Sequence, residues 1–170
     1  ALMNKAYSKA FAALGCEEYR QAAINNMDFL LEKFGSKGLL HHTYKNREAK
    51  INAFADDHAY LLDALIHLQE ITGNQGYLEK AAELMEKTLA GFSDPGTGFL
   101  YFTSLNQADA IIRKKEIYDG ATPSANSVMA GNLYYLGMIF GNQEWINRAV
   151  TLTESVLPVV TRYPGSFALW

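Results

Sequence analysis

One stretch decides the fold. From Asp56 to Phe92 it reads DDHAYLLDALIHLQEITGNQGYLEKAAELMEKTLAGF. Its apolar residues recur every three or four positions on both sides of Gly73, which is the spacing of amphipathic helices. Glycine adopts the left-handed conformation that ends a helix, and Asn74 can cap the helix that follows. We therefore predict a helical hairpin, with Asp56 as the N-cap of its first helix.

The same hairpin pattern occurs three times along the chain. Each copy has a glycine, an aromatic residue four positions later and an alanine eight positions later: Gly15/Tyr19/Ala23, Gly73/Tyr77/Ala81 and Gly141/Trp145/Ala149. Chance similarity among amphipathic helices is the alternative explanation. A repeat of this length indicates stacked supersecondary units that bury their faces against one another.

These repeats predict an all-α fold of repeated helical hairpins, at 1–34, 56–92 and 124–160. We expect helices at 2–14, 17–34, 57–72, 75–91, 125–140 and 143–160. Helix 125–140 is apolar all round and should be an interior one. Short β-hairpins are expected in the connections, with a strand at 39–44 and another at 99–102 paired with 111–114.

Alternating inner and outer helices, with long connections at one face, is the layout of an α/α toroid. Three hairpins correspond to about half of an (α/α)6 ring. We therefore expect residues 1–170 to be a single partial domain that is cut inside helices at both ends. The apolar faces left at those ends predict self-association.

Composition narrows the function classes. The 170 residues carry a formal net charge of −3, with 49% hydrophobic and 19% charged residues. This mild acidity argues against a nucleic-acid partner, and no apolar run is long enough to span a membrane. Cys16 is the single cysteine, so an internal disulfide is excluded. We expect a cytoplasmic protein with no cofactor and no metal.

The segment Arg113–Ser127, RKKEIYDGATPSANS, resembles the spermatogenesis-associated, thioredoxin-domain-containing family. The run Asp56-Asp57-His58-Ala59 resembles that family's Asp-Asp-Tyr-Ala, with His58 in place of tyrosine. Ala125 stands where the family has glycine. The resemblance implies a toroid similar to N-acylglucosamine 2-epimerases and six-hairpin glycosidases. It also implies two intramolecular partners in a longer protein, a thioredoxin-like domain and the remaining toroid hairpins.

Candidate catalytic residues occur where two inner helices begin. Asp57 and His58 are expected to form an acid/base pair, with pKa values moved toward neutrality by partial burial. Glu116 and Asp119 would supply the second carboxylate that glycoside hydrolysis requires. The alternative for Asp57 is a purely electrostatic role at the helix N-terminus.

Candidate binding residues precede and begin the fifth helix. Arg113 and Lys115 would hold a substrate hydroxyl or carboxylate, and Ser124 and Asn126 would form hydrogen bonds to it. The alternative is a set of ion pairs that order the loop. We expect one concave face to bring together Asp57, His58, Glu116, Asp119, Ser124 and Asn126.

Two histidine signals are weaker. His41 and His42 are adjacent on the expected strand, so at most one should enter a given site. His67 lies on the apolar stripe of its helix, where a hydrogen-bonded core histidine is the favoured interpretation.

Two functions from different classes remain open. The first is a carbohydrate-active or carbohydrate-binding toroid, epimerase-like or glycosidase-like, with a sugar ligand. The second is a non-catalytic scaffold or interaction domain that partners a thioredoxin-like module.

Overall fold

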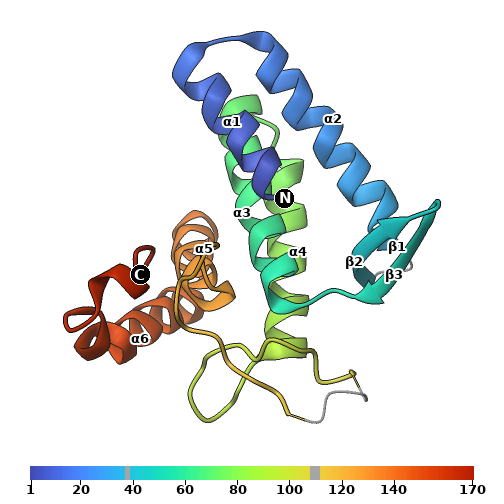
Figure 1. Ribbon diagram of the computed structural model, residues 1–170. Coiled ribbons are helices and arrows are strands. Elements are labelled where there is room, and N and C mark those ends of the chain that lie inside the picture. Colours follow the sequence, from blue (N-terminus) through green and yellow to red (C-terminus); the bar gives the residue numbers. More distant parts are fainter. Residues whose placement is uncertain (37–38, 108–111) are drawn as a thin grey trace. The chain divides into compact units, whose positions relative to one another are not determined.

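The computed structural model describes residues 1–36, 39–107 and 112–170. Contacts between residues divide the chain into two compact units, Ala1–Leu84 and Met85–Trp170. The described residues form six α-helices (Figure 1): α1 (Leu2–Leu14), α2 (Glu17–Lys33), α3 (Ala55–Thr72), α4 (Gly76–Phe92), α5 (Ala125–Phe140) and α6 (Gln143–Val160). These bounds confirm all six predicted helices to within two residues, and they confirm the predicted all-α hairpin fold.

The first unit is built around α3. Helix α1 packs against both α2 and α3. Leu62, Leu65 and Leu68 of α3 are almost completely buried, as is Met27 of α2. Burying such side chains contributes about 1.5–3 kcal/mol each, so this helix face is the main source of stability in the unit.

Two polar contacts fix the position of α1 in the first unit. Asn4 is fully buried and donates from Nδ2 to the carbonyl oxygen of Ala23 at 2.7 Å. Lys5 Nζ lies 2.6 Å from Asp63 Oδ2 on α3. Both side chains form directional bonds, so they specify how α1 sits on its neighbours.

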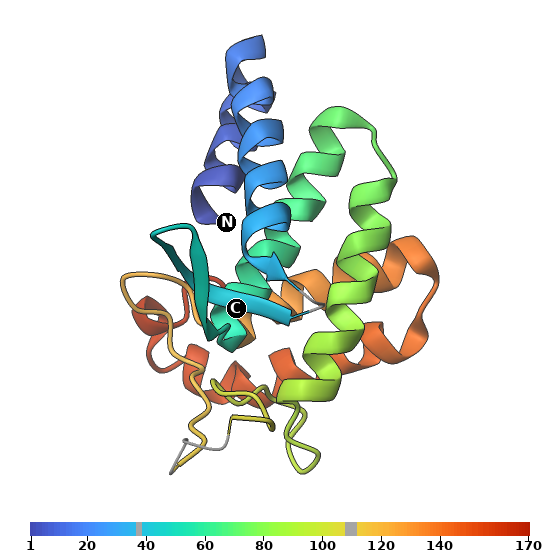
Figure 2. The same cartoon turned by 90° about the vertical axis from the view of Figure 1, so that its right-hand side faces the viewer.

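A small antiparallel sheet connects α2 to α3. It contains β1 (Gly35–Ser36), β2 (Leu39–Lys45) and β3 (Glu48–Asn52), in that order. Asn46 and Arg47 join β2 to β3 with φ values of 55° and 64°, and two positive φ angles are what a type I′ hairpin turn requires. The predicted strand at 39–44 is confirmed. Figure 2 shows the chain passing from this sheet directly into α3.

The second unit contains the end of α4, the connection, α5, α6 and a 3₁₀ turn, η1 (Pro164–Ser166). Helices α5 and α6 approach closely where Gly137 faces Ile146. A β-carbon added at Gly137 would lie only 2.7 Å from Ile146 Cγ1. Glycine at this position therefore permits the close packing of the two helices.

The predicted strand at 99–102 does not form. Leu100 makes an isolated antiparallel bridge with Ser93, and the N–H of Phe102 donates to the carbonyl oxygen of Lys114 at 2.7 Å. Backbone hydrogen bonds tie this connection together without a continuous ladder. Ile111, the first residue of the predicted partner strand, lies outside the described residues.

The repeated glycines have the same conformation. Gly15, Gly73 and Gly141 have φ values of 64°, 69° and 66°, and each donates its N–H to a carbonyl oxygen four residues earlier. The alanines eight residues after them are buried: Ala23, Ala81 and Ala149. The repeat in the sequence is thus a repeat in structure.

Two expectations about helix ends and burial were wrong. The N-cap of α3 is Phe54 and not Asp56, so the helix begins two residues earlier than predicted. The last turn of α5 exposes Met138, Ile139 and Phe140, and Tyr134 is exposed one turn earlier, so this helix is not interior on all sides. At the other inner helix, Ser124 caps α5, because its side chain accepts from the N–H of Ser127. None of the described helices has the length and apolar character needed to cross a membrane.

Candidate functional site

A cavity of about 350 Å³ lies in the first unit, where α1 and α3 begin and α2 ends. Its walls are mainly apolar, and its polar side chains gather at the start of α3. The lining residues are Ala1, Leu2, Met3, Leu30, Phe34, Leu40, His41, His42, Asp57, Tyr60 and Leu61. This size and mixture are typical of small-ligand pockets, which hold a few polar groups in an apolar surround.

Asp57 is the acidic residue that borders this cavity. Its Oδ2 accepts from the backbone N–H of Phe54 at 2.9 Å and lies 2.8 Å from Nδ1 of His42. The first bond satisfies an N–H at the start of α3. The second brings the carboxylate into contact with His42 on β2. Asp57 therefore both bonds the start of α3 and has a side-chain partner at the cavity.

His42 was only a weak candidate in the sequence, yet it borders the cavity. Its ring is held on two sides, by Asp57 Oδ2 and by an edge-on contact with Phe54, whose ring centroid lies 5.0 Å away. Both His41 and His42 border the cavity, contrary to the expectation that at most one would. Their rings have different partners, since His41 Nδ1 lies 3.1 Å from the carbonyl oxygen of Phe34.

Asp56 differs electrostatically from its neighbour. Burial raises the pKa of Asp56, and the nearby charge of Asp57 raises it further. Its Oδ1 accepts from the backbone N–H of Asp57 at 2.9 Å.

His58 does not behave as predicted. Burial lowers the pKa of His58 from 6.5 to about 4, and the charge of Asp57 offsets only part of that effect. The expected shift toward neutrality is therefore wrong. A neutral, buried imidazole at physiological pH is a poor proton donor, so His42 replaces His58 as the histidine partner of Asp57.

In the second unit, Asp119 bonds to two segments of the chain. Its Oδ1 accepts from the N–H of Ser124 at 2.8 Å and from Ser127 Oγ at 2.7 Å. Its Oδ2 accepts from the N–H of Leu169 at 2.8 Å. Oδ1 thus stabilises the start of α5, and Oδ2 stabilises the C-terminal segment.

Asn126 is also committed to internal bonds. Its side chain exchanges two hydrogen bonds with the backbone of Leu100 and donates a third to the carbonyl oxygen of Glu116 at 2.8 Å. With Asn126 only 1% exposed, its amide is not available to a ligand. These bonds favour a structural role for Asn126, and its binding role stays a prediction.

Lys115 and Arg113 order the connection. Lys115 Nζ lies 2.6 Å from Asp94 Oδ2, and this bond holds the pKa of Asp94 well below its usual range. Arg113 donates to the carbonyl oxygen of Thr103, and its guanidinium carbon lies 4.0 Å from the ring centroid of Tyr101. These contacts match the alternative interpretation, in which the charged run orders the loop.

Glu116 is the exception in this run. Its backbone carbonyl is fixed by Asn126, while its carboxylate is exposed and contacts no partner among the residues that the structure describes. A free carboxylate on an anchored backbone keeps Glu116 as the catalytic candidate of the second unit. Asp57 and Glu116 belong to different units, so their convergence on one face stays a prediction.

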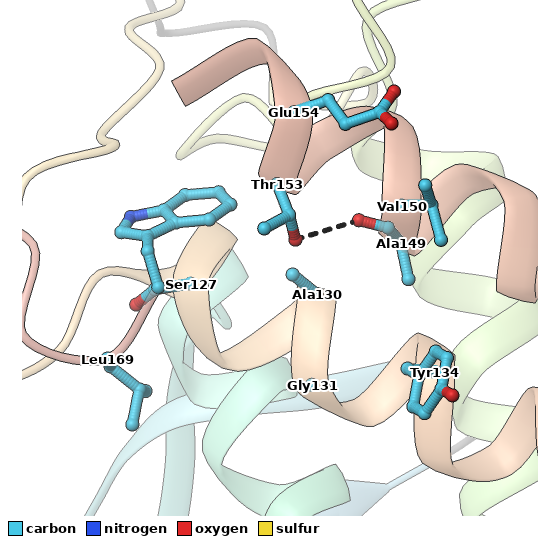
Figure 3. A pocket seen from close by; sticks show the side chains of 10 residues that line it. Ser127, Ala130, Gly131, Tyr134, Ala149, Val150, Thr153, Glu154 and Leu169 are labelled. Carbon is cyan, nitrogen blue, oxygen red and sulfur yellow. Dashed lines mark hydrogen bonds between the residues drawn. The ribbon is translucent and has the colours of Figure 1, made fainter. Parts of the chain in front are cut away.

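The second unit has a cavity of its own, about 410 Å³, between α5 and α6 (Figure 3). Small residues line much of it, including Ala130, Gly131 and Ala149, and Glu154 is its one charged side chain. Figure 3 shows Thr153 bonding to the carbonyl oxygen of Ala149. This cavity has one carboxylate and no histidine, whereas the other brings Asp57 together with His41 and His42, so the cavity beside Asp57 is the stronger candidate site.

Metal ligands are not grouped in the described part of the chain. Over residues 1–36, 39–107 and 112–170, no three side chains among His, Cys, Asp and Glu come together in a way that could hold a metal ion.

Comparison with solved structures defines the class of protein. A GH76 α-mannanase of Bacteroides thetaiotaomicron superimposes with a TM-score of 0.66 at 18% identity, covering 89% of this chain and 41% of the mannanase chain. At this identity the likeness concerns the fold alone. The chain is therefore part of an α/α toroid, as predicted.

Sequence comparison confirms the family resemblance. Spermatogenesis-associated protein 20 of mouse is 30% identical over 174 aligned residues, and the human protein is 28% identical. Each alignment covers 96% of this chain. The chain is thus a homologue of one segment of spermatogenesis-associated protein 20. It spans about a fifth of these relatives' length, 22% in both cases. No protein-family model matches the chain.

Proposed function

We propose that the chain carries part of the sugar site of a carbohydrate-processing or carbohydrate-binding toroid. One observation carries the proposal: two titratable side chains, Asp57 and His42, bond to each other at a cavity where α3 begins. The relation in fold to an α-mannanase supports α-mannosides as the first sugars to test.

The chemistry of the group suits a glycosidic bond. Glycoside hydrolysis uses one carboxyl group as an acid and a second as a base or nucleophile. Asp57 is the carboxyl group that borders the cavity and would fill one of these two roles. Its bonds to the N–H of Phe54 and to His42 hold the carboxylate in place.

The walls of the cavity suit a sugar ring. Tyr60 and the ring pair of His42 and Phe54 lie at or beside the cavity and offer flat faces to the C–H groups of a pyranose. Asp57 and His42 offer polar atoms to its hydroxyl groups. Charge-assisted hydrogen bonds of this kind fix the orientation of a ligand.

Binding tests the proposal directly. Titration of the 170-residue chain with methyl α-mannoside and α-mannobiose, followed by NMR, should shift resonances of Asp57, Tyr60 and Leu61. Asp57→Ala should weaken binding at least about tenfold, which corresponds to about 1.4 kcal/mol. Glu79→Ala is the matched control, since Glu79 is an exposed first-turn carboxylate of α4. Equal binding by both variants, or no shift at the cavity, would refute the proposal.

A second candidate function is the non-catalytic scaffold. The observation that favours it is the commitment of Asp119, Asn126 and Lys115 to internal bonds. Such a domain would bind a thioredoxin-like module and no sugar. A purified thioredoxin-like domain of a full-length homologue, titrated against the chain, separates the two functions.

A further inference from the structure

His42 and Asp57 lie 15 residues apart, on β2 and at the start of α3. The imidazole Nδ1 and the carboxylate Oδ2 are 2.8 Å apart. An ionised carboxylate only accepts hydrogen bonds, so Nδ1 must carry the proton in this contact. The contact therefore selects one tautomer of the ring.

The orientation of the ring is fixed as well. Phe54 contacts it edge-on, and Phe54 is itself held by its N–H bond to Asp57. The three residues form a closed set in which Asp57 binds both of the others. An imidazole held at two points loses little further freedom when a ligand binds, which is the usual benefit of preorganisation.

One ring nitrogen remains for a ligand. Nε2 has no hydrogen-bond partner among the described residues, and 39% of the His42 side chain is exposed. His42 also borders the cavity. With Nδ1 protonated, Nε2 carries a lone pair and can accept a hydrogen bond or a proton.

We infer that His42 is a ligand-contacting residue whose Nε2 accepts a hydrogen bond from a ligand hydroxyl group, and that Asp57 is the residue that positions it. This inference rests on the proposed function for the class of ligand. It assigns Asp57 a second task, orienting a base, in addition to bonding the N–H of Phe54. Many catalytic sites use the same arrangement, in which a base is oriented by its hydrogen bond to a further side chain.

The first test is the tautomer of His42, read from ¹⁵N shifts of the ring in the 170-residue chain without ligand. We expect Nδ1–H with a bare Nε2. Asp57→Ala should return the ring to the Nε2–H form that free histidine favours. Asp57→Asn should keep the Nδ1–H form, because the amide oxygen can still accept. Glu79→Gln, at an exposed carboxylate of α4, is the control and should leave the tautomer of His42 unchanged. An Nε2–H ring in the unmodified chain overturns the inference.

The second test uses methyl α-mannoside. The ¹⁵Nε2 signal of His42 should move on addition of the sugar, and the movement should be lost in Asp57→Ala. If Tyr60 and Leu61 respond while Nε2 does not, the cavity binds sugar and the role given to His42 is wrong. If no cavity residue responds, the sugar assignment itself fails, whatever the tautomer.

Discussion

The side chain of Asn126 binds both backbone polar groups of Leu100. Oδ1 accepts from the N–H at 2.7 Å, and Nδ2 donates to the carbonyl oxygen at 3.0 Å. A side chain at the start of α5 thus takes the place of a neighbouring strand. This explains how the connection after α4 stays ordered without a ladder, and why an amide at this position is structural.

Removing that amide should destabilise the second unit. Asn126→Ala removes a partner from three backbone groups, two on the buried Leu100 and one on Glu116. We expect a loss of about 3 kcal/mol in the free energy of unfolding, measured by urea denaturation. Asn147→Ala is the control, because Asn147 is exposed and its side chain accepts a hydrogen bond from Gln143 on the same helix. A loss below about 1 kcal/mol for Asn126→Ala would contradict the structural role.

The close approach of α5 and α6 can be tested at two glycines of one helix. Gly137→Ala places a methyl group against Ile146 and should cost about 1–3 kcal/mol. Gly131→Ala meets no atom within 4 Å and should instead stabilise the helix by up to about 1 kcal/mol. Thermal unfolding of both variants gives the comparison. If both substitutions change the stability in the same direction, helix propensity rather than packing against Ile146 determines the effect at Gly137.

His58 should make stability depend on pH. Its folded-state pKa is about 4, below the ordinary value of 6.5. Between these values the unfolded chain binds a proton that the folded chain does not. Stability should therefore fall as the pH drops from about 6.5 to 4, by about 3 kcal/mol, with no contribution above that range. The free energy of unfolding of the chain and of His58→Gln, measured at pH 7 and pH 4.5, tests this prediction. The variant should show a smaller loss of stability between the two pH values. An NMR midpoint for His58 near 6.5 would contradict the burial.

The exposed last turn of α5 predicts self-association. Met138, Ile139 and Phe140 are each about half exposed, and adjacent apolar side chains of this kind usually find a partner. The mass measured by light scattering should rise with protein concentration. Ile139→Glu should lower it toward the monomer, whereas Lys80→Glu, at an exposed position on α4, should not. A constant monomer mass would argue against a role for this surface.

The helices were predictable because their signals are local. Apolar spacing and left-handed glycines depend on neighbours within a turn, so the boundaries near Gly73 and Gly141 were found from the sequence. The start of α3 was missed for a local reason too. Phe54 has no side-chain acceptor, so its residue type does not indicate an N-cap. The polar bond at this end is formed by the Asp57 carboxylate, which accepts from the N–H of Phe54.

The site was less predictable because its contacts are distant in the chain. His42 reaches Asp57 only through the position of β2 beside α3, which no spacing rule encodes. In the second unit the difficulty was ambiguity. A residue type that binds hydroxyl groups of a ligand also binds backbone groups, as Asn126 and Asp119 do.

The three glycine turns are equivalent positions within one chain, so the residues that follow them can be compared directly. Asn74 and Asn142 follow two of the glycines and accept hydrogen bonds from the next helix, whereas Cys16 follows the third and accepts none. Cys16 already has the extended backbone of an N-cap, with φ −83° and ψ 114°. Cys16→Asn should thus supply the missing cap and stabilise α2 by about 1 kcal/mol. Comparing copies within one molecule identifies a weak position that comparison with other proteins would otherwise be needed to find.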